Sequence, residues 1–293
     1  MQPIYSCINS GTLKLDGGAM FGIIPKPLWN KKIAADESNR IDMTMRVQVI
    51  QVGKRVILID TGIGDYHDER FRQNFALSDT SDPLLSPLKK AGIGPDAVTD
   101  IIISHLHFDH VGGLGSFENN QKELLFPKAD IHVHQKHYEY SQKPNIRDAG
   151  SFQHKHFLPI LTKYKELGQL KLLTEDSGTI LSEGKYQLKY KTTSGHTPFQ
   201  LHPYDEKFFF FGDIIPTAHH VGIPWVMGYD MNPGVTTVEK LKLLEWIEIQ
   251  KLRVIFNHDR DHWGATVKKD EKGQFIFTDF KKSSQQAWEK LAL

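Results

Sequence analysis

Four predicted strands of this chain, three of them short apolar runs and one an alternating segment, each lead into a histidine or an aspartate. An apolar run of this length that stops at a polar turn is typical of a buried β-strand. Loops that follow strand ends are where α/β proteins usually build their binding and catalytic sites. The segments are 100–104 before His105-Leu106-His107-Phe108-Asp109-His110, 186–195 before His196, 207–212 before Asp213 and 253–257 before His258.

The rest of the chain adds strands, helices and turns to this pattern. Strands occur on both sides of helices in two similar halves, which predicts a layered α/β architecture with packed sheets. The other predicted elements are a hairpin of strands 45–52 and 54–60 that turns at Gly53-Lys54, a strand at 129–134, a short helix at 86–92 and an irregular polar stretch at 64–81.

The best helix candidate is the segment 236–252. Thr236 followed by Glu239 has the spacing of a capping box, in which each side chain bonds a free backbone amide of the first turn. A recurring apolar face predicts the side that packs on a sheet. That face comprises Val238, Leu241, Leu244 and Ile247.

Composition excludes several classes of protein. Lys and Arg number 36 against 35 Asp and Glu, so a net charge of +1 argues against a general nucleic-acid binder or a polybasic membrane anchor. Cys7 is the single cysteine, which excludes an intrachain disulfide and a cysteine-rich metal site. The chain has no run of 18 apolar residues and no basic start before an apolar stretch. We therefore expect a cytoplasmic protein without a membrane span.

The run from His105 to His110 places four nitrogen or oxygen ligands within six residues. This density exceeds what one tetrahedral ion can use together with other ligands, so we expect two ions about 3.5–4 Å apart. His105 and His107 then serve one ion, while Asp109 and His110 serve the other. Three later residues can complete the two shells, with the carboxylate bridging: His196, His258 and Asp213. Imidazole and carboxylate ligands suit Zn²⁺, and Fe, Mn or Co stay open.

These motifs resemble those of the metallo-β-lactamase-fold hydrolase superfamily. The stretch 104–114 (SHLHFDHVGGL) matches its central signature. The family's upstream strand and turn are matched by 58–62, and its downstream motifs are matched in order by 194–198, 210–213 and 257–259. The likeness therefore spans roughly 45–265. It implies a four-layer αββα sandwich, here one domain over residues 1–293. It also implies His105, His107 and His196 at one metal, Asp109, His110 and His258 at the other, Asp213 as the bridge, and Asp60 as a group that orients the ligands.

Within the superfamily the chain is most similar to the N-acyl homoserine lactonase and methyl parathion hydrolase branch. It departs from that branch at Phe199 and Gln200, where a glycine and a second histidine are usual. It also has Ile214, Ile215 and Pro216 where some lactonases have a tyrosine.

The resemblance implies a hydrolase with two divalent ions, most simply Zn²⁺, that cleaves a lactone or carboxylic ester by metal-bound hydroxide. Asp213 and Asp109 are the expected catalytic residues, Asp109 as the proton carrier. A phosphotriesterase is the main alternative, followed by an iron redox enzyme on the same ligands and a non-catalytic metal-stabilised protein. Expected substrate contacts are Phe21, Trp29, Phe108, His219, Trp225 and Met227. His219 is the expected hydrogen-bond partner of a substrate oxygen, and the apolar character of the other five suits an uncharged small molecule. The apolar segment 19–29 further predicts a homodimer.

Overall fold

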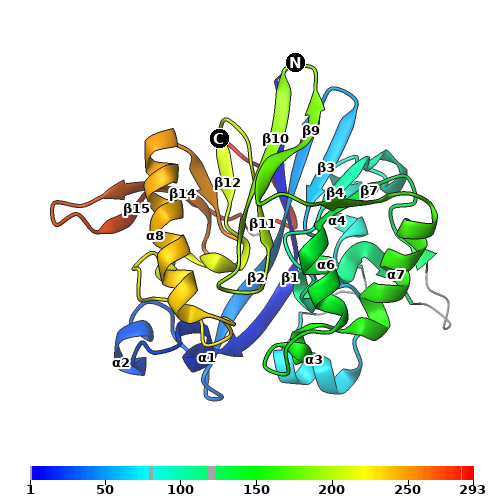
Figure 1. Cartoon of the computed structure of the whole chain (residues 1–293). Helices are drawn as coiled ribbons and strands as arrows, with labels where there is room; N and C mark the ends of the chain where they lie inside the picture. The colour runs from blue at the N-terminus through cyan, green and yellow to red at the C-terminus, as the bar shows by residue number, and fades with distance from the viewer. Residues whose placement is uncertain (1, 79–81, 118–122, 285) are drawn as a thin grey trace.

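The computed structural model describes residues 2–78, 82–117, 123–284 and 286–293. Within them, two sheets of seven strands pack face to face (Figure 1). The first has the order β16 (Trp288–Lys290), β1 (Ile4–Asp16), β2 (Arg40–Val52), β3 (Arg55–Ile59), β4 (Asp100–Ile102), β7 (Asp130–His134), β8 (Leu170–Leu173). The second has the order β15 (Phe275–Lys282), β14 (His262–Lys269), β13 (Arg253–Ile255), β12 (Phe208–Phe210), β11 (Gln200–Tyr204), β10 (Tyr186–Thr193), β9 (Ser177–Glu183).

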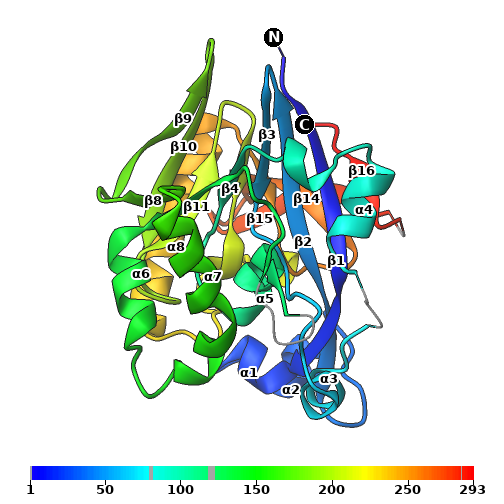
Figure 2. The same ribbon diagram turned by 90° about the vertical axis from the view of Figure 1, so that its right-hand side faces the viewer.

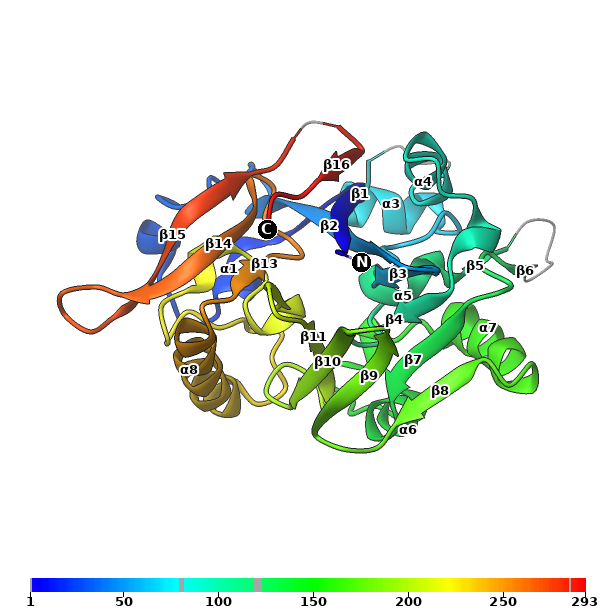
Figure 3. The same ribbon diagram turned by 90° about the horizontal axis from the view of Figure 1, so that it is seen from above.

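Helices cover the outer faces of the two sheets, as the views in Figures 2 and 3 show. Apolar residues of α4 and α7 join the core of the first sheet, and α8 packs on the second. This arrangement confirms the predicted four-layer αββα sandwich. The helices are α1 (Gly17–Phe21), α2 (Lys26–Trp29), α3 (Glu69–Phe75), α4 (Leu85–Lys90), α5 (Phe108–Val111), α6 (Gln135–Gln142), α7 (His154–Glu166) and α8 (Pro233–Gln250), with a small hairpin of β5 (Gly115–Ser116) and β6 (Glu123–Leu124).

The run of four phenylalanines that contains β12 shows how one segment serves two cores. Successive side chains of a strand point to opposite faces, so a strand covered on both sides is apolar throughout. Phe208 and Phe210 lie between the two sheets. Phe209 and Phe211 pack on the other side, in the core shared with α8. All four side chains are fully buried, which explains why no polar residue interrupts this run.

Most predicted elements are confirmed, and the differences lie in the segment 64–81, in the first strand and in α8. The hairpin at Gly53 is present as β2 and β3, with Gly53 at a positive φ of 59°. The segment 64–81, expected to be irregular, contains α3, and its residues 79–81 lie outside the described residues. The long first strand β1, which pairs with β2 along most of its length, was not predicted, because its apolar and polar residues do not alternate regularly.

The predicted face of α8 is half confirmed, because Leu244 and Ile247 are buried against the second sheet, and its predicted capping box is wrong. Val238 and Leu241 are exposed, at 52% and 40%. The helix begins at Pro233, one turn earlier than expected, which moves Thr236 into its interior. The side chain of Glu239 instead accepts hydrogen bonds from the backbone amides of the loop before His196. Tertiary contacts of this loop therefore outcompete the local cap.

Among the described residues, no helix combines the length and the apolar character required to cross a membrane.

The double-sided burial of β12 leads to a stability prediction. Replacing Phe210 by Ala leaves a cavity between the sheets, and we expect the free energy of unfolding to fall by about 3–5 kcal/mol in chemical denaturation. Phe280→Ala is the control, because Phe280 is 44% exposed and its loss should cost about 0.5 kcal/mol. Equal losses in the two variants would contradict this account of the core.

Candidate metal centre

The ends of four strands, one in the first sheet and three in the second, bring the predicted ligands together. The loops that follow β4, β10, β12 and β13 carry them, and β12 pairs in parallel with β13, so their carboxyl ends lie at the same edge. Every one of these side chains is at least nine-tenths buried. They are His105, His107, Asp109, His110, His196, Asp213 and His258.

Three imidazoles form the first cluster. The Nδ1 atom of His107 lies 3.0 Å from Nε2 of His105 and 3.3 Å from Nε2 of His196. Nitrogens bound to one tetrahedral ion at 2.0–2.1 Å are separated from one another by about 3.3 Å. The three atoms therefore already have the spacing of a metal-binding triad.

Two further imidazoles and a carboxylate form the second cluster. The Nε2 atoms of His110 and His258 are 3.3 Å apart. Asp109 faces both of them, with carboxylate oxygens 3.8 Å from Nε2 of His110 and 3.7 Å from Nε2 of His258. These three groups could hold a second ion.

Asp213 lies between the two clusters. Its Oδ2 atom faces the first cluster, 3.5 Å from Nε2 of His196 and 3.9 Å from Nε2 of His105. Its Oδ1 atom faces the second, 3.0 Å from Nε2 of His258 and 3.3 Å from Nε2 of His110. One carboxylate thus presents one oxygen to each cluster.

The outer nitrogens of three of the histidines are held by hydrogen bonds. His110 Nδ1 lies 2.8 Å from Asp60 Oδ2, and His196 Nδ1 lies 2.9 Å from Asp230 Oδ1. His258 Nδ1 donates to the carbonyl of Thr44 at 2.9 Å. Each of these contacts orients its imidazole so that the inner nitrogen of the ring is directed toward the cluster.

Asp60 also links two ligand histidines, His110 directly and His105 through Ser104. One of its oxygens accepts the backbone N–H of Ser104 at 2.7 Å, and the other accepts the Ser104 hydroxyl at 2.8 Å. The hydroxyl in turn lies 3.1 Å from Nδ1 of His105, which fixes that ring as well. Asp60 adopts a left-handed backbone conformation, with φ of 61°, to reach these positions. Such strain in a non-glycine residue persists only where the surrounding contacts hold it.

Lone pairs that face one another at these distances repel unless a cation lies between them. The Oδ1 atom of Asp213, which faces the second cluster, is buried and has no hydrogen-bond partner among the described residues. The donor set and its spacing therefore fit a pair of divalent cations.

The pKa values in the cluster follow from burial and mutual charge. Burial lowers the pKa of His105 and of His107 well below the usual value, and neighbouring histidines lower it further, so both present neutral imidazoles. Burial also disfavours charge on His110, but carboxylates, Asp213 foremost, raise its pKa well above the usual value. For Asp213 the opposite holds, because His258 and His110 lower its pKa despite burial. The centre thus combines neutral imidazoles at His105 and His107 with a retained negative charge on Asp213, and both features suit a cation site.

An apolar cluster, here called the wall, lies beside the centre and contains five of the six predicted substrate contacts. These are Phe21, Trp29, Phe108, Trp225 and Met227. The rings of Phe21 and Trp29 stack with their centroids 5.5 Å apart. Both side chains are fully buried, so they form the inner layer of this cluster. Trp225, which is half-buried, meets Phe21 edge-on at 5.7 Å. Phe108 and Met227 belong to the same cluster, and Phe108 directly precedes the ligand candidate Asp109 in the chain. His219 is half-buried, and burial lowers its pKa.

Tyr229 is a residue near the centre that the sequence did not single out. It is 38% exposed. Burial raises its pKa to about 12, with contributions from the charges of Asp16 and Asp109. Its phenol therefore keeps its proton at neutral pH within electrostatic range of the centre. The only sequence signal for it was its place in the loop 216–233 after Asp213.

The two residues that depart from the lactonase pattern occupy defined positions. Phe199 has a positive φ of 58°, where a glycine is usual, and its ring stacks on His134 at 4.8 Å. The amide nitrogen of Gln200 lies 3.5 Å from the carbonyl of Phe211. A side chain at Gly212 would collide with this amide. Gln200 therefore lies directly beneath the turn that presents Asp213.

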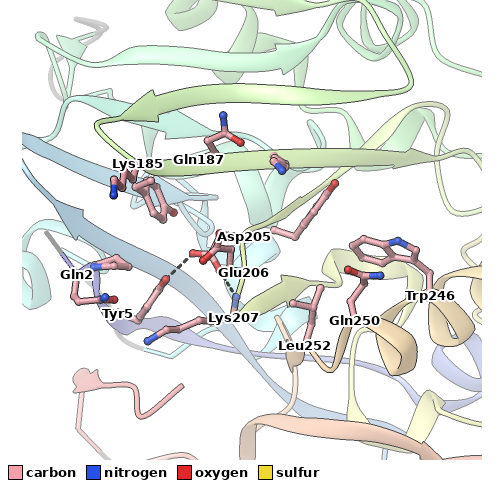
Figure 4. A pocket seen from close by; sticks show the side chains of 14 residues that line it. Gln2, Tyr5, Lys185, Gln187, Asp205, Glu206, Lys207, Trp246, Gln250 and Leu252 are labelled. Atoms are coloured by element: carbon pink, nitrogen blue, oxygen red, sulfur yellow. Dashed lines mark hydrogen bonds between the residues drawn. The ribbon is translucent and has the colours of Figure 1, made fainter.

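Away from the metal centre lies a hollow of about 370 Å³, here called the second hollow (Figure 4). It lies at the starts of β10, β12 and β13, whose opposite ends lead to the metal centre. In its floor Tyr5 donates a hydrogen bond to the buried carboxylate of Asp205 at 2.6 Å. Its lining includes Lys185, Lys207 and Glu206 as well as aromatic rings, so it presents mixed charge and no ligand cluster.

Comparison with known proteins decides the family. The model of the Metallo-beta-lactamase superfamily matches residues 47–272. The chain belongs to this superfamily. An N-acyl homoserine lactonase of Bacillus cereus is 25% identical over 260 residues, which cover 83% of this chain and 88% of that protein.

Solved structures agree with the superfamily fold and with hydrolase chemistry. A protein of Staphylococcus aureus described as a probable metal-dependent hydrolase has a TM-score of 0.84 and 26% identity, with 98% of this chain and 100% of that chain covered. AidC, described as a dizinc quorum-quenching lactonase, has a TM-score of 0.74 at 20% identity over 97% of this chain and 96% of that chain, which shows the fold alone. This member of the superfamily is a metal-dependent hydrolase.

Proposed function

We propose that this protein is a dizinc lactonase that opens the ring of uncharged lactones with an apolar acyl chain. The observation that carries the proposal is the position of Asp213, with one carboxylate oxygen toward each of two ligand clusters. Two clusters that share one carboxylate suit a pair of ions acting on one bond. The Bacillus cereus relative and the AidC fold neighbour, both described as lactonases, support this substrate class.

We assign the first ion to His105, His107 and His196, and the second to Asp109, His110 and His258, with Asp213 between them. When bound, such ions supply an acidified water and polarise the carbonyl that it attacks. Asp60 and Asp230 hold the rings of His110 and His196 in the required orientation.

Asp109 is the proposed proton carrier. Its carboxylate faces His110 and His258, and the side chain is 7% exposed. In ester cleavage a proton must leave the attacking water and reach the departing alkoxide, and a carboxylate at this position can perform both transfers. The apolar residues Phe108 and Met227, at 9% and 3% exposure, exclude water from that side.

The contacts of the wall favour an uncharged substrate. Two cationic side chains reach the loop that carries Trp225 and Tyr229, and both donate to its backbone. Arg147 donates to the carbonyls of Gly228 and Asp230. Lys240 donates to the carbonyls of Gly222 and Trp225. Since a buried substrate carboxylate would need a free cation, an ester with an apolar tail fits better than an anionic one.

The first test is metal content. We expect purified protein to contain about two zinc ions per chain by elemental analysis. Asp213→Asn removes a charge shared by both sites and should lower occupancy and kcat together, whereas the exposed Asp96→Asn should change neither. Full occupancy and normal turnover in Asp213→Asn would contradict the assignment. Iron with a visible absorption band would favour a redox enzyme instead.

The second test is substrate choice. We expect kcat/KM for acyl homoserine lactones to rise with acyl length and to exceed the values for aryl phosphotriesters, glutathione thioesters and β-lactams. Trp225→Ala should raise KM for a long-chain lactone about tenfold with little change in kcat, because it removes apolar contact area from the wall. Trp246→Ala, at the second hollow, should leave KM unchanged. A flat dependence on acyl length, or a phosphotriester as the best substrate, would overturn the lactonase proposal.

The third test concerns assembly. We propose a homodimer through the segment 19–29, in which Ile23 is 81% and Leu28 is 51% exposed. Apolar side chains this exposed and this close together favour association. Light scattering should therefore give a dimer that Ile23→Asp dissociates and that Ile146→Asp, at an exposed isoleucine elsewhere, does not. A monomeric wild-type protein at micromolar concentration would refute the proposal.

A further inference from the structure

A lysine lies in the buried stripe of α8. The helix packs on the second sheet through Leu243, Leu244 and Ile247, and Lys240 belongs to the same face with no exposed surface. A fully buried ammonium group is costly unless hydrogen bonds replace its water. Its contacts therefore indicate what the side chain is for.

The ammonium group of Lys240 is held by backbone carbonyls. Its Nζ atom donates to the carbonyl of Gly222 at 2.6 Å and to that of Trp225 at 2.8 Å. Both of these partners are backbone carbonyls, and the carboxylate whose charge acts on this nitrogen is that of Asp230, which is itself bonded to His196. The carbonyl of Gly222 also accepts the N–H of Trp225, so the lysine closes a turn that the backbone has begun.

This turn forms one side of the apolar wall. The ring of Trp225 meets Phe21 edge-on, and the backbone N–H of Gly228 donates to the carbonyl of Ala19 at 2.7 Å. Gly22 approaches the carbonyl of Val226 so closely that a Cβ atom there would lie 2.7 Å from it. The turn therefore positions the segment that bears α1 as well as its own tryptophan.

The preceding residue of the helix holds a different loop. The carboxylate of Glu239 accepts the N–H groups of Ser194 and Gly195, each at 2.8 Å. The next residue in the chain is His196, whose ring faces His107. Two adjacent side chains of α8 thus reach the two loops on either side of the centre.

We propose that Lys240 is the positioning residue of the substrate wall and Glu239 that of the His196 loop, so that two adjacent residues of α8 each hold one of the two loops. Only the kinetic part of this proposal rests on the proposed function, since it takes the wall to hold the acyl chain. Lys240 acts on KM through Trp225, and Glu239 acts on metal retention and kcat through His196.

Hydrogen exchange of the metal-loaded protein, followed by mass spectrometry, tests the proposal without a substrate. Lys240→Met keeps the length of the side chain and removes its donors. We expect exchange in residues 222–228 to accelerate about tenfold or more, with residues 194–196 unchanged. Glu239→Gln should accelerate exchange at Ser194 and Gly195, leave 222–228 unchanged and weaken zinc retention against a chelator. The controls are the exposed Lys242→Met and Glu245→Gln on the same helix.

Kinetics provide the second readout. With the best lactone of the panel, Lys240→Met should raise KM about tenfold with kcat within about twofold and full metal content, whereas Glu239→Gln should lower kcat. Lys240→Gln, which keeps an uncharged N–H donor group on a shorter side chain, should fall between Lys240→Met and wild type and serves if the methionine variant does not fold. Exchange in Lys240→Met equal to that in Lys242→Met, or equal acceleration of both loops in each variant, would overturn the proposal. Absence of lactonase activity in the wild type would instead remove the proposed function and leave the exchange test intact.

Discussion

The inner nitrogens of five buried histidines face one another and a shared carboxylate across distances of 3.0–3.9 Å, and three of these rings are fixed by hydrogen bonds at their outer nitrogens. Without positive charge between them, this arrangement is strongly unfavourable in a buried site. The surrounding structure maintains it through Asp60, Asp230 and the carbonyl of Thr44, which fix the outer nitrogens. The sandwich is thus a frame that holds lone pairs in place for cations.

The geometry of the frame explains why the ligands come from distant parts of the chain. Each of the two sheets contributes strand ends at one edge, and the phenylalanine run of β12 binds the second sheet both to the first sheet and to α8. The loop that carries Asp213 follows this run directly, so packing on both faces of β12 restricts its movement. The rigidity that the centre requires therefore originates in the core between the layers, far from the metal ligands in sequence.

Much of this could be predicted from the sequence because the informative signals are local. A strand run followed by His105-x-His107-x-Asp109-His110 identifies the site, and the later ligands each follow a strand of their own. What could not be predicted depends on contacts between distant residues. Glu239 has the spacing of a helix cap but bonds the loop at 194–195, and Lys240 lies in the stripe where an apolar residue is expected. The extent of the domain, the dimer, the zinc and the cytoplasmic location stay predictions.

The central claim is that two cations lie in the clusters on either side of Asp213. Anomalous scattering from a crystal, measured at the zinc absorption edge, tests it most directly. The account predicts two peaks about 3.5–4 Å apart, one among the nitrogens of His105, His107 and His196 and one beside His110 and His258. A single peak, or none in protein that has never met a chelator, would contradict it.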